Sequence, residues 1–218
     1  MLSVNDPHGS IEVLHTGAPI ESANRALILI HGRGSTAREI LTLAPEFAVA
    51  DFAVLAPQAT GNVWYPQRFM RPVEENEPYL SSALAAVDRL VQHLGDNGIP
   101  PERIAIGGFS QGACLTTEYA ARHPRRYGAI LAFSGGLIGD ANKPLPIHHP
   151  GTPLAGTPVF IGCSDVDSHI PIERVDETAS ILSTMGGEVD KRIYPGMGHT
   201  INQDEIEAAA ALLNAVGR

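Results

Sequence analysis

The chain has 218 residues, of which 44% are hydrophobic and 18% charged, and its formal net charge is −9. This length and composition predict one globular domain over residues 1–218 with a sizeable core, and they argue against a disordered chain. The excess of acidic residues argues against nucleic acid and anionic membrane surfaces as partners, because both need clustered Lys and Arg.

The cysteines and the N-terminus predict a cytoplasmic protein. Cys114 and Cys163 fall beside predicted buried strands, where reduced packing residues are expected and not a disulfide. The N-terminus lacks the basic start and apolar run of a secretory signal. No apolar run approaches the roughly 20 residues that a membrane span needs, so no membrane span is expected.

Apolar runs and amphipathic segments alternate along the chain. The runs predict strands at residues 11–16, 26–30, 52–57, 103–106, 128–133, 157–162 and 188–194. Helical spacing and terminal signals predict helices at residues 37–47, 80–94, 114–122, 175–185 and from 202 onward. Such alternation implies right-handed crossovers and a largely parallel sheet with helices on both faces.

Two of the predicted helices begin with a capping signal. Ser35 or Thr36 is a plausible N-cap for the first helix, with Glu39 placed to complete a capping box. Asn202 begins the last helix in the same way, with Glu205 three residues later.

Two long connections lack regular patterns. Residues 57–78 contain four prolines and several aromatic residues, including Trp64 and Tyr65, and we expect an ordered functional loop. Residues 137–157 are rich in Pro and Gly, which predicts an excursion over the sheet.

The segment from Gly108 to Gly112 has the pattern G-x-S-x-G, placed between a predicted strand and a predicted helix. This pattern is typical of a nucleophile elbow, a sharp turn that exposes the hydroxyl of its central serine, Ser110. Glycine is needed at both flanking positions because a side chain would collide with the neighbouring strand or helix. The alternative is an ordinary turn whose serine caps the helix.

Polar residues follow four strands of the predicted sheet. They are the turn at residues 31–34, Ser110, the pair Asp165 and Asp167, and His199. Ligands bind at the carboxyl ends of parallel strands, so these groups should converge. Histidine can take a proton from serine and a carboxylate can orient the imidazole, and the chain order Ser, Asp, His is that of α/β-hydrolases. By spacing alone, either aspartate could support His199.

His199 differs from the other histidines because glycines flank its turn after the last strand. Most of the others are predicted on surfaces or at helix ends and need no function, among them His8, His15, His93 and His123. The pair His148–His149 lacks carboxylates or cysteines at ligand spacing, so no metal is expected.

Together these motifs resemble the phospholipase/carboxylesterase family of α/β-hydrolases, which includes the acyl-protein thioesterases. The matching stretches are residues 29–34, 64–65, 107–113, Asp167 four residues before Pro171, and residues 196–199. Residues 76–78 and 81–83 are more similar to bacterial carboxylesterase-type members. The resemblance implies a three-layer α/β-hydrolase fold, with a mostly parallel twisted sheet of about seven strands, helices on both faces and no large lid.

The resemblance also implies roles for particular residues. The family's acid lies in a D-x-x-V/I-P pattern, which residues 167–171 match, so Asp167 is selected; Ser168 departs from the proline that often follows, and Asp165 becomes a loop-structuring residue. The oxyanion hole should use the backbone N–H of Gln111, the residue after the nucleophile, and that of Arg33, to which the family match points. The Arg33 guanidinium is interpreted as a surface charge.

Trp64 and Tyr65 correspond to a family segment that borders the active site. They are candidates for one wall of the substrate pocket, and packing of their loop onto the sheet is the equal alternative.

The predicted function is therefore a serine carboxylesterase that forms an acyl-enzyme without a cofactor. Its expected substrates are small-molecule carboxylic esters, with phospholipid or small aromatic esters among the options. The alternatives are an acyl thioesterase and, from a different class, a non-catalytic binding module on the same scaffold. The resemblance implies association as a homodimer.

Overall fold

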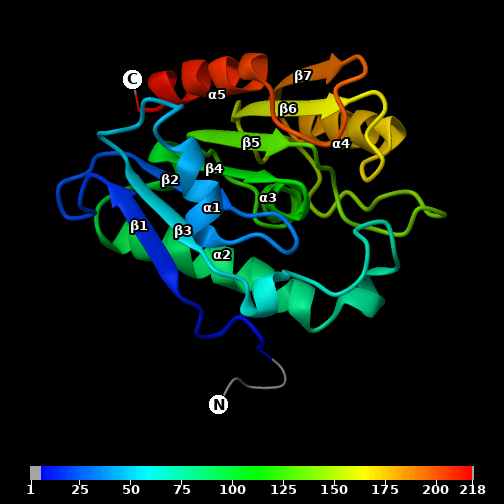
Figure 1. Ribbon diagram of the computed structural model, residues 1–218, viewed down its shortest axis with the longest axis horizontal. Helices are drawn as coiled ribbons and strands as arrows, with labels where there is room; N and C mark the ends of the chain where they lie inside the picture. The colour runs from blue at the N-terminus through cyan, green and yellow to red at the C-terminus, as the bar shows by residue number, and fades with distance from the viewer. Residues whose placement is uncertain (1–5, 218) are drawn as a thin grey trace.

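The computed structural model describes residues 6–217 of the chain, which form one sheet with helices on both sides (Figure 1). Seven strands lie in these residues, in the spatial order β1 (Val13–Gly17), β3 (Ala53–Pro57), β2 (Ala26–Ile30), β4 (Ile104–Phe109), β5 (Ala129–Phe133), β6 (Pro158–Ser164) and β7 (Glu188–Tyr194). Only the edge strand β1 is antiparallel to its neighbour; the remaining pairs are parallel. This confirms the predicted mostly parallel sheet.

The helices form the two outer layers of the fold. They are α1 (Ala37–Ile40), α2 (Tyr79–Asp96), α3 (Gln111–Arg122), α4 (Ile172–Thr184) and α5 (Gln203–Ala215), with short 3₁₀ turns at Leu41–Leu43, Thr60–Asn62, Val73–Asn76 and Pro101–Arg103. Apolar residues of α2, α3 and α4 pack on one face of the sheet, and those of α1 and α5 pack on the other.

The core consists of two apolar layers separated by the sheet. Ile28 and Ile30 point into the layer beneath α2, α3 and α4, whereas Leu27 and Leu29 point into the opposite layer. All four side chains are fully buried. A strand covered on both faces needs apolar residues at every position, which is why the sequence reads as continuous apolar runs.

The first helix is much shorter than the predicted span 37–47. It ends at Ile40 and continues only as a 3₁₀ turn, because Pro45 has no N–H to donate to the carbonyl of Leu41 and its ring crowds that carbonyl. Thr36, and not Ser35, is its N-cap, and the predicted capping box with Glu39 is present.

His8 corrects the prediction of a surface position. Its side chain is fully buried, its Nε2 donates to the carbonyl of Trp64 (2.9 Å), and its Nδ1 accepts from the N–H of Thr60 (3.3 Å). Burial lowers the pKa of His8. The N-terminal segment thus supports the aromatic connection, an arrangement that no local pattern reveals.

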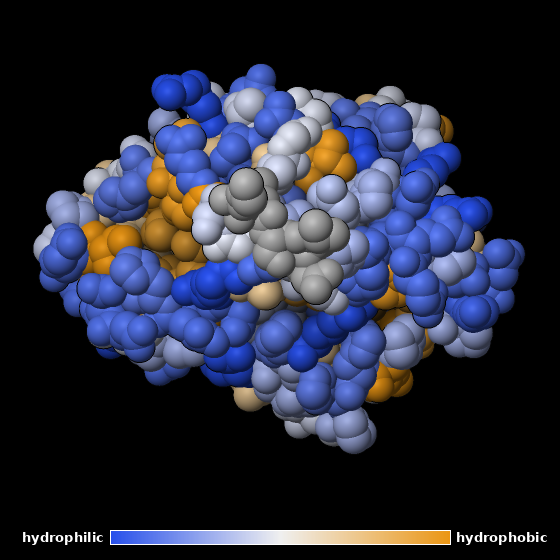
Figure 2. Space-filling model, turned by 90° about the horizontal axis from the view of Figure 1, so that it is seen from below, coloured by the Kyte–Doolittle hydropathy of each residue, from blue (hydrophilic) through white to orange (hydrophobic). Residues whose placement is uncertain are grey.

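The molecular surface is largely hydrophilic on the face shown in Figure 2, with apolar side chains in separate patches. Within residues 6–217, no helix combines the length and the apolar character needed to cross a bilayer.

Candidate active site

Ser110 lies on a sharp turn between β4 and α3. Its backbone has φ of 55° and ψ of −117°, a conformation that a non-glycine residue rarely adopts and that is typical of a strained functional turn. A Cβ on Gly108 would lie 2.5 Å from the carbonyl carbon of Gly112, and a Cβ on Gly112 would lie 2.1 Å from the carbonyl oxygen of Ile30. The two glycines are therefore required by close backbone approach, as the sequence predicted.

The structure brings Ser110, His199 and Asp167 together from three loops. Ser110 Oγ lies 2.8 Å from His199 Nε2, and His199 Nδ1 lies 2.7 Å from Asp167 Oδ2. The ionised carboxylate of Asp167 can only accept, so it assigns the proton to Nδ1 of the neutral ring and leaves Nε2 free to accept from the serine. The imidazole is thus oriented to take the proton of the Ser110 hydroxyl.

Asp167 is held as an anion by its surroundings. Its side chain is completely buried behind His199, and its Oδ1 accepts from the N–H groups of His169 (2.8 Å) and Ile170 (3.0 Å). Burial by itself raises the pKa of this carboxyl, but the hydrogen bonds from His199 and the two N–H groups outweigh it and hold the pKa of Asp167 below its usual value.

Asp165 occupies a different place, although it is only two residues away. Its Oδ1 accepts from the N–H of Gly196 (2.7 Å), in the turn that carries His199. Ser164 Oγ adds a second tie by accepting from the N–H of Gly198 (3.2 Å). The loop after β6 therefore positions the loop after β7 through side-chain to backbone hydrogen bonds.

The predicted oxyanion-hole donors lie at the start of α3 and in the loop after β2. Within residues 6–217 no hydrogen-bond acceptor is present for the N–H of Gln111 or of Arg33. Gly32, Arg33 and Gln111 line the same cleft as Ser110. Two unused donors beside a candidate nucleophile match what an oxyanion requires.

The Arg33 guanidinium is more than a surface charge. It donates to the carbonyls of Tyr65 (2.9 Å), Pro66 (3.0 Å) and Gln67 (2.6 Å). The side chain therefore fastens the aromatic connection to the loop that would supply an oxyanion donor. Sequence alone could not show this, because the acceptors are backbone atoms that carry no residue signature.

Gln111 fastens the same connection from its other side. Its Oε1 accepts from the N–H of Trp64 (3.0 Å), and its Nε2 donates to the carbonyl of Tyr65 (2.8 Å). Trp64 lies behind the cleft, fully buried, with its indole N–H donating to the carbonyl of His31 (2.9 Å). Tyr65 lines the cleft. Of the two aromatic candidates for the pocket wall, the structure therefore supports Tyr65 and not Trp64.

The cleft above Ser110 has a volume of about 350 Å³. Several further residues line it that the sequence did not predict as pocket residues, including Arg68, Phe69, Phe109, His169 and Ile170. The His169 ring lies 4.6 Å and the Phe109 ring 4.9 Å from that of His199, centroid to centroid, so both rings pack against the imidazole. Residues 137–157, all within the described part of the chain, contribute nothing to this lining.

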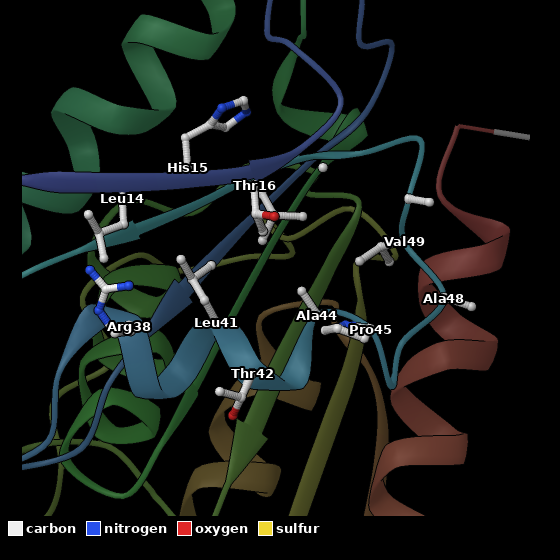
Figure 3. Close-up of a pocket in the computed structure, with 13 residues that line it drawn as sticks. Leu14, His15, Thr16, Arg38, Leu41, Thr42, Ala44, Pro45, Ala48 and Val49 are labelled. Atoms are coloured by element: carbon white, nitrogen blue, oxygen red, sulfur yellow. The ribbon is translucent and has the colours of Figure 1, made fainter.

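A second recess lies away from the triad, beside β1 and α1 (Figure 3). Its volume is about 660 Å³, larger than that of the cleft. Leu14, Leu41, Ala44, Pro45 and Val49 supply much of its wall. None of the predicted site residues contributes to it.

A serine on a strand-to-helix turn, in a mostly parallel sheet with helices on both faces, defines the α/β-hydrolase class. The sequence model of the phospholipase/carboxylesterase family matches residues 12–216. The chain therefore belongs to the phospholipase/carboxylesterase family, whose members are serine hydrolases, as the sequence resemblance predicted.

Relatives with a solved structure or an assigned name support this family membership. A crystal structure of a phospholipase/carboxylesterase from Dyadobacter fermentans is 44% identical, with a TM-score of 0.89, over 94% of this chain and 97% of that one. Acyl-protein thioesterase 1 of Saccharomyces cerevisiae is 29% identical over 92% of this chain and 96% of the relative. Acyl-protein thioesterase 1 of Gibberella zeae is 33% identical over 57% of this chain, which spans 52% of that relative's length.

Proposed function

We propose that this protein is a carboxylesterase that cleaves small carboxylic esters through an acyl-enzyme on Ser110. The observation that best supports this is the hydrogen-bonded chain from Ser110 through His199 to Asp167 at the floor of the cleft. A volume of about 350 Å³ lies toward the small end of the range for ligand pockets, roughly 300–1,000 Å³, which favours small ester substrates.

In the first step, the Ser110 oxygen attacks the ester carbonyl carbon while its proton moves to His199 Nε2. The carbonyl oxygen becomes an oxyanion, which the N–H groups of Gln111 and Arg33 stabilise. Asp167 stabilises the imidazolium that forms. His199 then gives the proton to the leaving alkoxide, and the acyl group remains on the serine.

In the second step, a water molecule attacks the acyl-enzyme in place of the alcohol. His199 Nε2 takes a proton from the water, and the same oxyanion donors serve the second tetrahedral intermediate. Return of the proton to Ser110 releases the carboxylic acid. Neither step requires a metal or an organic cofactor, because acid–base and electrostatic groups of the chain supply all the chemistry.

Acyl thioesters are the second candidate substrates, favoured by the names of the fungal relatives. The same groups would act, but a thiolate leaves without needing full protonation, so the demand on His199 as an acid is smaller. Matched oxo- and thioesters of one acyl group would separate the two functions: a carboxylesterase hydrolyses both, and its preference for the oxoester distinguishes it.

We also propose a cytoplasmic location, supported by Cys114 and Cys163, which are both buried free cysteines. Association as a homodimer is proposed by family resemblance, and sedimentation of the purified protein would test it.

Replacement of Ser110 by Ala tests the proposed function. The variant should lose about a thousandfold or more of its rate on p-nitrophenyl butyrate, because the nucleophile is gone and only binding and the oxyanion donors remain. Ser81→Ala, at an exposed position on α2, is the matched control and should keep the wild-type rate. A Ser110→Ala protein that folds normally and keeps most of its activity would overturn the assignment.

A further inference from the structure

The lining of the catalytic cleft has an unusual charge for this chain. Arg33, Arg68, His169 and His199 all contribute to it, and no Asp or Glu does, among residues 6–217. The whole chain carries 24 acidic and only 15 basic residues. A cleft lined by two arginines and by no carboxylate among residues 6–217, in an acidic protein, attracts anionic ligands.

Of the two arginines, Arg33 already has hydrogen-bond acceptors within the protein. All three of its hydrogen bonds go to backbone carbonyls, and its guanidinium lies 5.9 Å from the centre of the Tyr65 ring. These contacts give the side chain a structural role in the cleft wall.

Arg68 is different, because its guanidinium has no acceptor. Its side chain is exposed at the cleft, and it makes neither an ion pair nor a side-chain hydrogen bond within the described part of the chain. Arg71, only three residues farther on, is bound at two points by Glu75, at 2.9 and 3.0 Å. The free guanidinium is thus a property of this position and not of the segment.

Asp167 and Glu39 contact residues that line the cleft, but their hydrogen bonds go to groups other than Arg68. Asp167 is completely buried behind His199. Glu39 accepts from Ser35 Oγ (2.6 Å) and from the N–H of Thr36 (3.0 Å) in its capping box. Neither carboxylate forms an ion pair with Arg68, so the positive charge at the cleft remains available to a ligand.

We propose that Arg68 binds a negatively charged group of the substrate, so that the preferred esters are acidic ones. The inference rests on the proposed function, since it assigns part of the same cleft. A guanidinium presents a planar fork of N–H donors that a carboxylate or phosphate accepts at two points. The anion can belong to the acyl or to the alcohol part of the ester, and the two are separated by experiment.

Two matched pairs of esters test this inference. Monomethyl adipate and methyl hexanoate differ by a carboxylate on the acyl part, whereas 4-acetoxybutyrate and butyl acetate differ by one on the alcohol part. Hydrolysis would be followed by NMR for the wild type, Arg68→Gln, Arg68→Lys and Arg71→Gln. Arg71→Gln is the control, because it removes a nearby charge that does not line the cleft.

The wild type should have a KM lower by about five- to tenfold for the acidic member of one pair, the size expected of a partly exposed charge-assisted contact. Arg68→Gln should remove that preference, so that the KM values for the acidic and the neutral member of the pair become equal. Arg68→Lys should restore part of the preference, and Arg71→Gln should retain it. Added salt should weaken the preference, because screening acts on exposed charges.

Hydrolysis of neutral esters without any preference for the acidic members would overturn the inference and leave the proposed function intact. A preference that survives in Arg68→Gln would also overturn it. Failure to hydrolyse any ester, with wild type and Ser110→Ala behaving alike, would instead overturn the proposed function and this inference with it.

Discussion

The cleft above Ser110 and the recess beside β1 both contain a hydroxyl and an imidazole, but the two regions arrange these groups differently. In the larger recess, the Thr42 hydroxyl donates to the carbonyl of Glu39 (2.7 Å) and His15 Nε2 donates to the carbonyl of Ala18 (3.0 Å). Figure 3 shows these two side chains pointing away from each other. In the cleft, Ser110 and His199 bond to each other.

The difference lies in where the two regions sit in the fold. The cleft is at the carboxyl ends of parallel strands, where loops from separate units converge and polar side chains from each can meet. The larger recess is formed by an edge strand and a short helix with its following turn, whose polar groups bond locally. Volume therefore says less about function than the partners of each polar group do.

The comparison of the two regions predicts its largest loss of kcat for Asp167→Asn. Asp165→Asn, two residues away, is the matched variant. Asp167→Asn removes the carboxylate that orients His199, and kcat should fall by about a hundred- to ten-thousandfold. Asp165→Asn weakens only the tie to Gly196 and should lower kcat by about tenfold or less. Steady-state rates on one p-nitrophenyl ester would decide, and equal losses in the two variants would contradict the assignment of the acid.

Glu205→Gln should produce a smaller effect, on stability. Burial raises the pKa of Glu205 to about 7; its Oε1 is buried and, within residues 6–217, has no partner, while Oε2 accepts from the N–H of Asn202. The folded state thus binds this proton more tightly than the unfolded state, whose pKa is near the ordinary 4.5. The associated stabilisation is complete below pH 4.5 and is lost as the pH rises through 7.

Between pH 5 and pH 8, the wild type should therefore lose roughly 2–3 kcal/mol of unfolding free energy through this group. Glu205→Gln should show a correspondingly flatter dependence, because glutamine can still cap the helix and does not ionise. Glu207→Gln, at an exposed position on the same helix, is the control and should follow the wild type. Urea unfolding at the two pH values measures this; parallel curves for all three proteins would refute the account of Glu205.

His15→Ala, in the larger recess, should have the smallest effect. The ring bonds only to a nearby backbone carbonyl in the described structure, so kcat and KM for ester hydrolysis should stay within about twofold of wild type. The measurement is the steady-state kinetics of His15→Ala, determined in parallel with those of Asp167→Asn. A loss of hydrolysis in His15→Ala would break the distinction between the two regions.

Much of this architecture could be predicted because the sequence carries it locally. The apolar runs of β2 and β5 follow from burial on both faces, and the predicted cap of α5 at Asn202 is present with its partner Glu205. The convergence of Ser110 and His199 followed from a general property of parallel sheets, which places strand ends at one edge. These features depend on short-range patterns and on topology alone.

The remaining features depend on contacts between distant segments. The choice between Asp165 and Asp167 is made by loop geometry, which turns one carboxylate toward Gly196 and the other toward His199. The burial of His8 and the bonds of the Arg33 guanidinium both involve backbone atoms of the aromatic connection. Because every residue has a backbone carbonyl, the sequence cannot show which of them accept these hydrogen bonds.

Reaction with a fluorophosphonate tests the central claim most directly, because the reagent traps a serine only when a base activates it. The folded wild-type protein should gain one adduct per chain by intact-mass spectrometry, located on Ser110 by peptide mapping, and Ser110→Ala should gain none. An unlabelled wild-type protein, or an adduct on another residue, would contradict the assignment of Ser110 as the nucleophile.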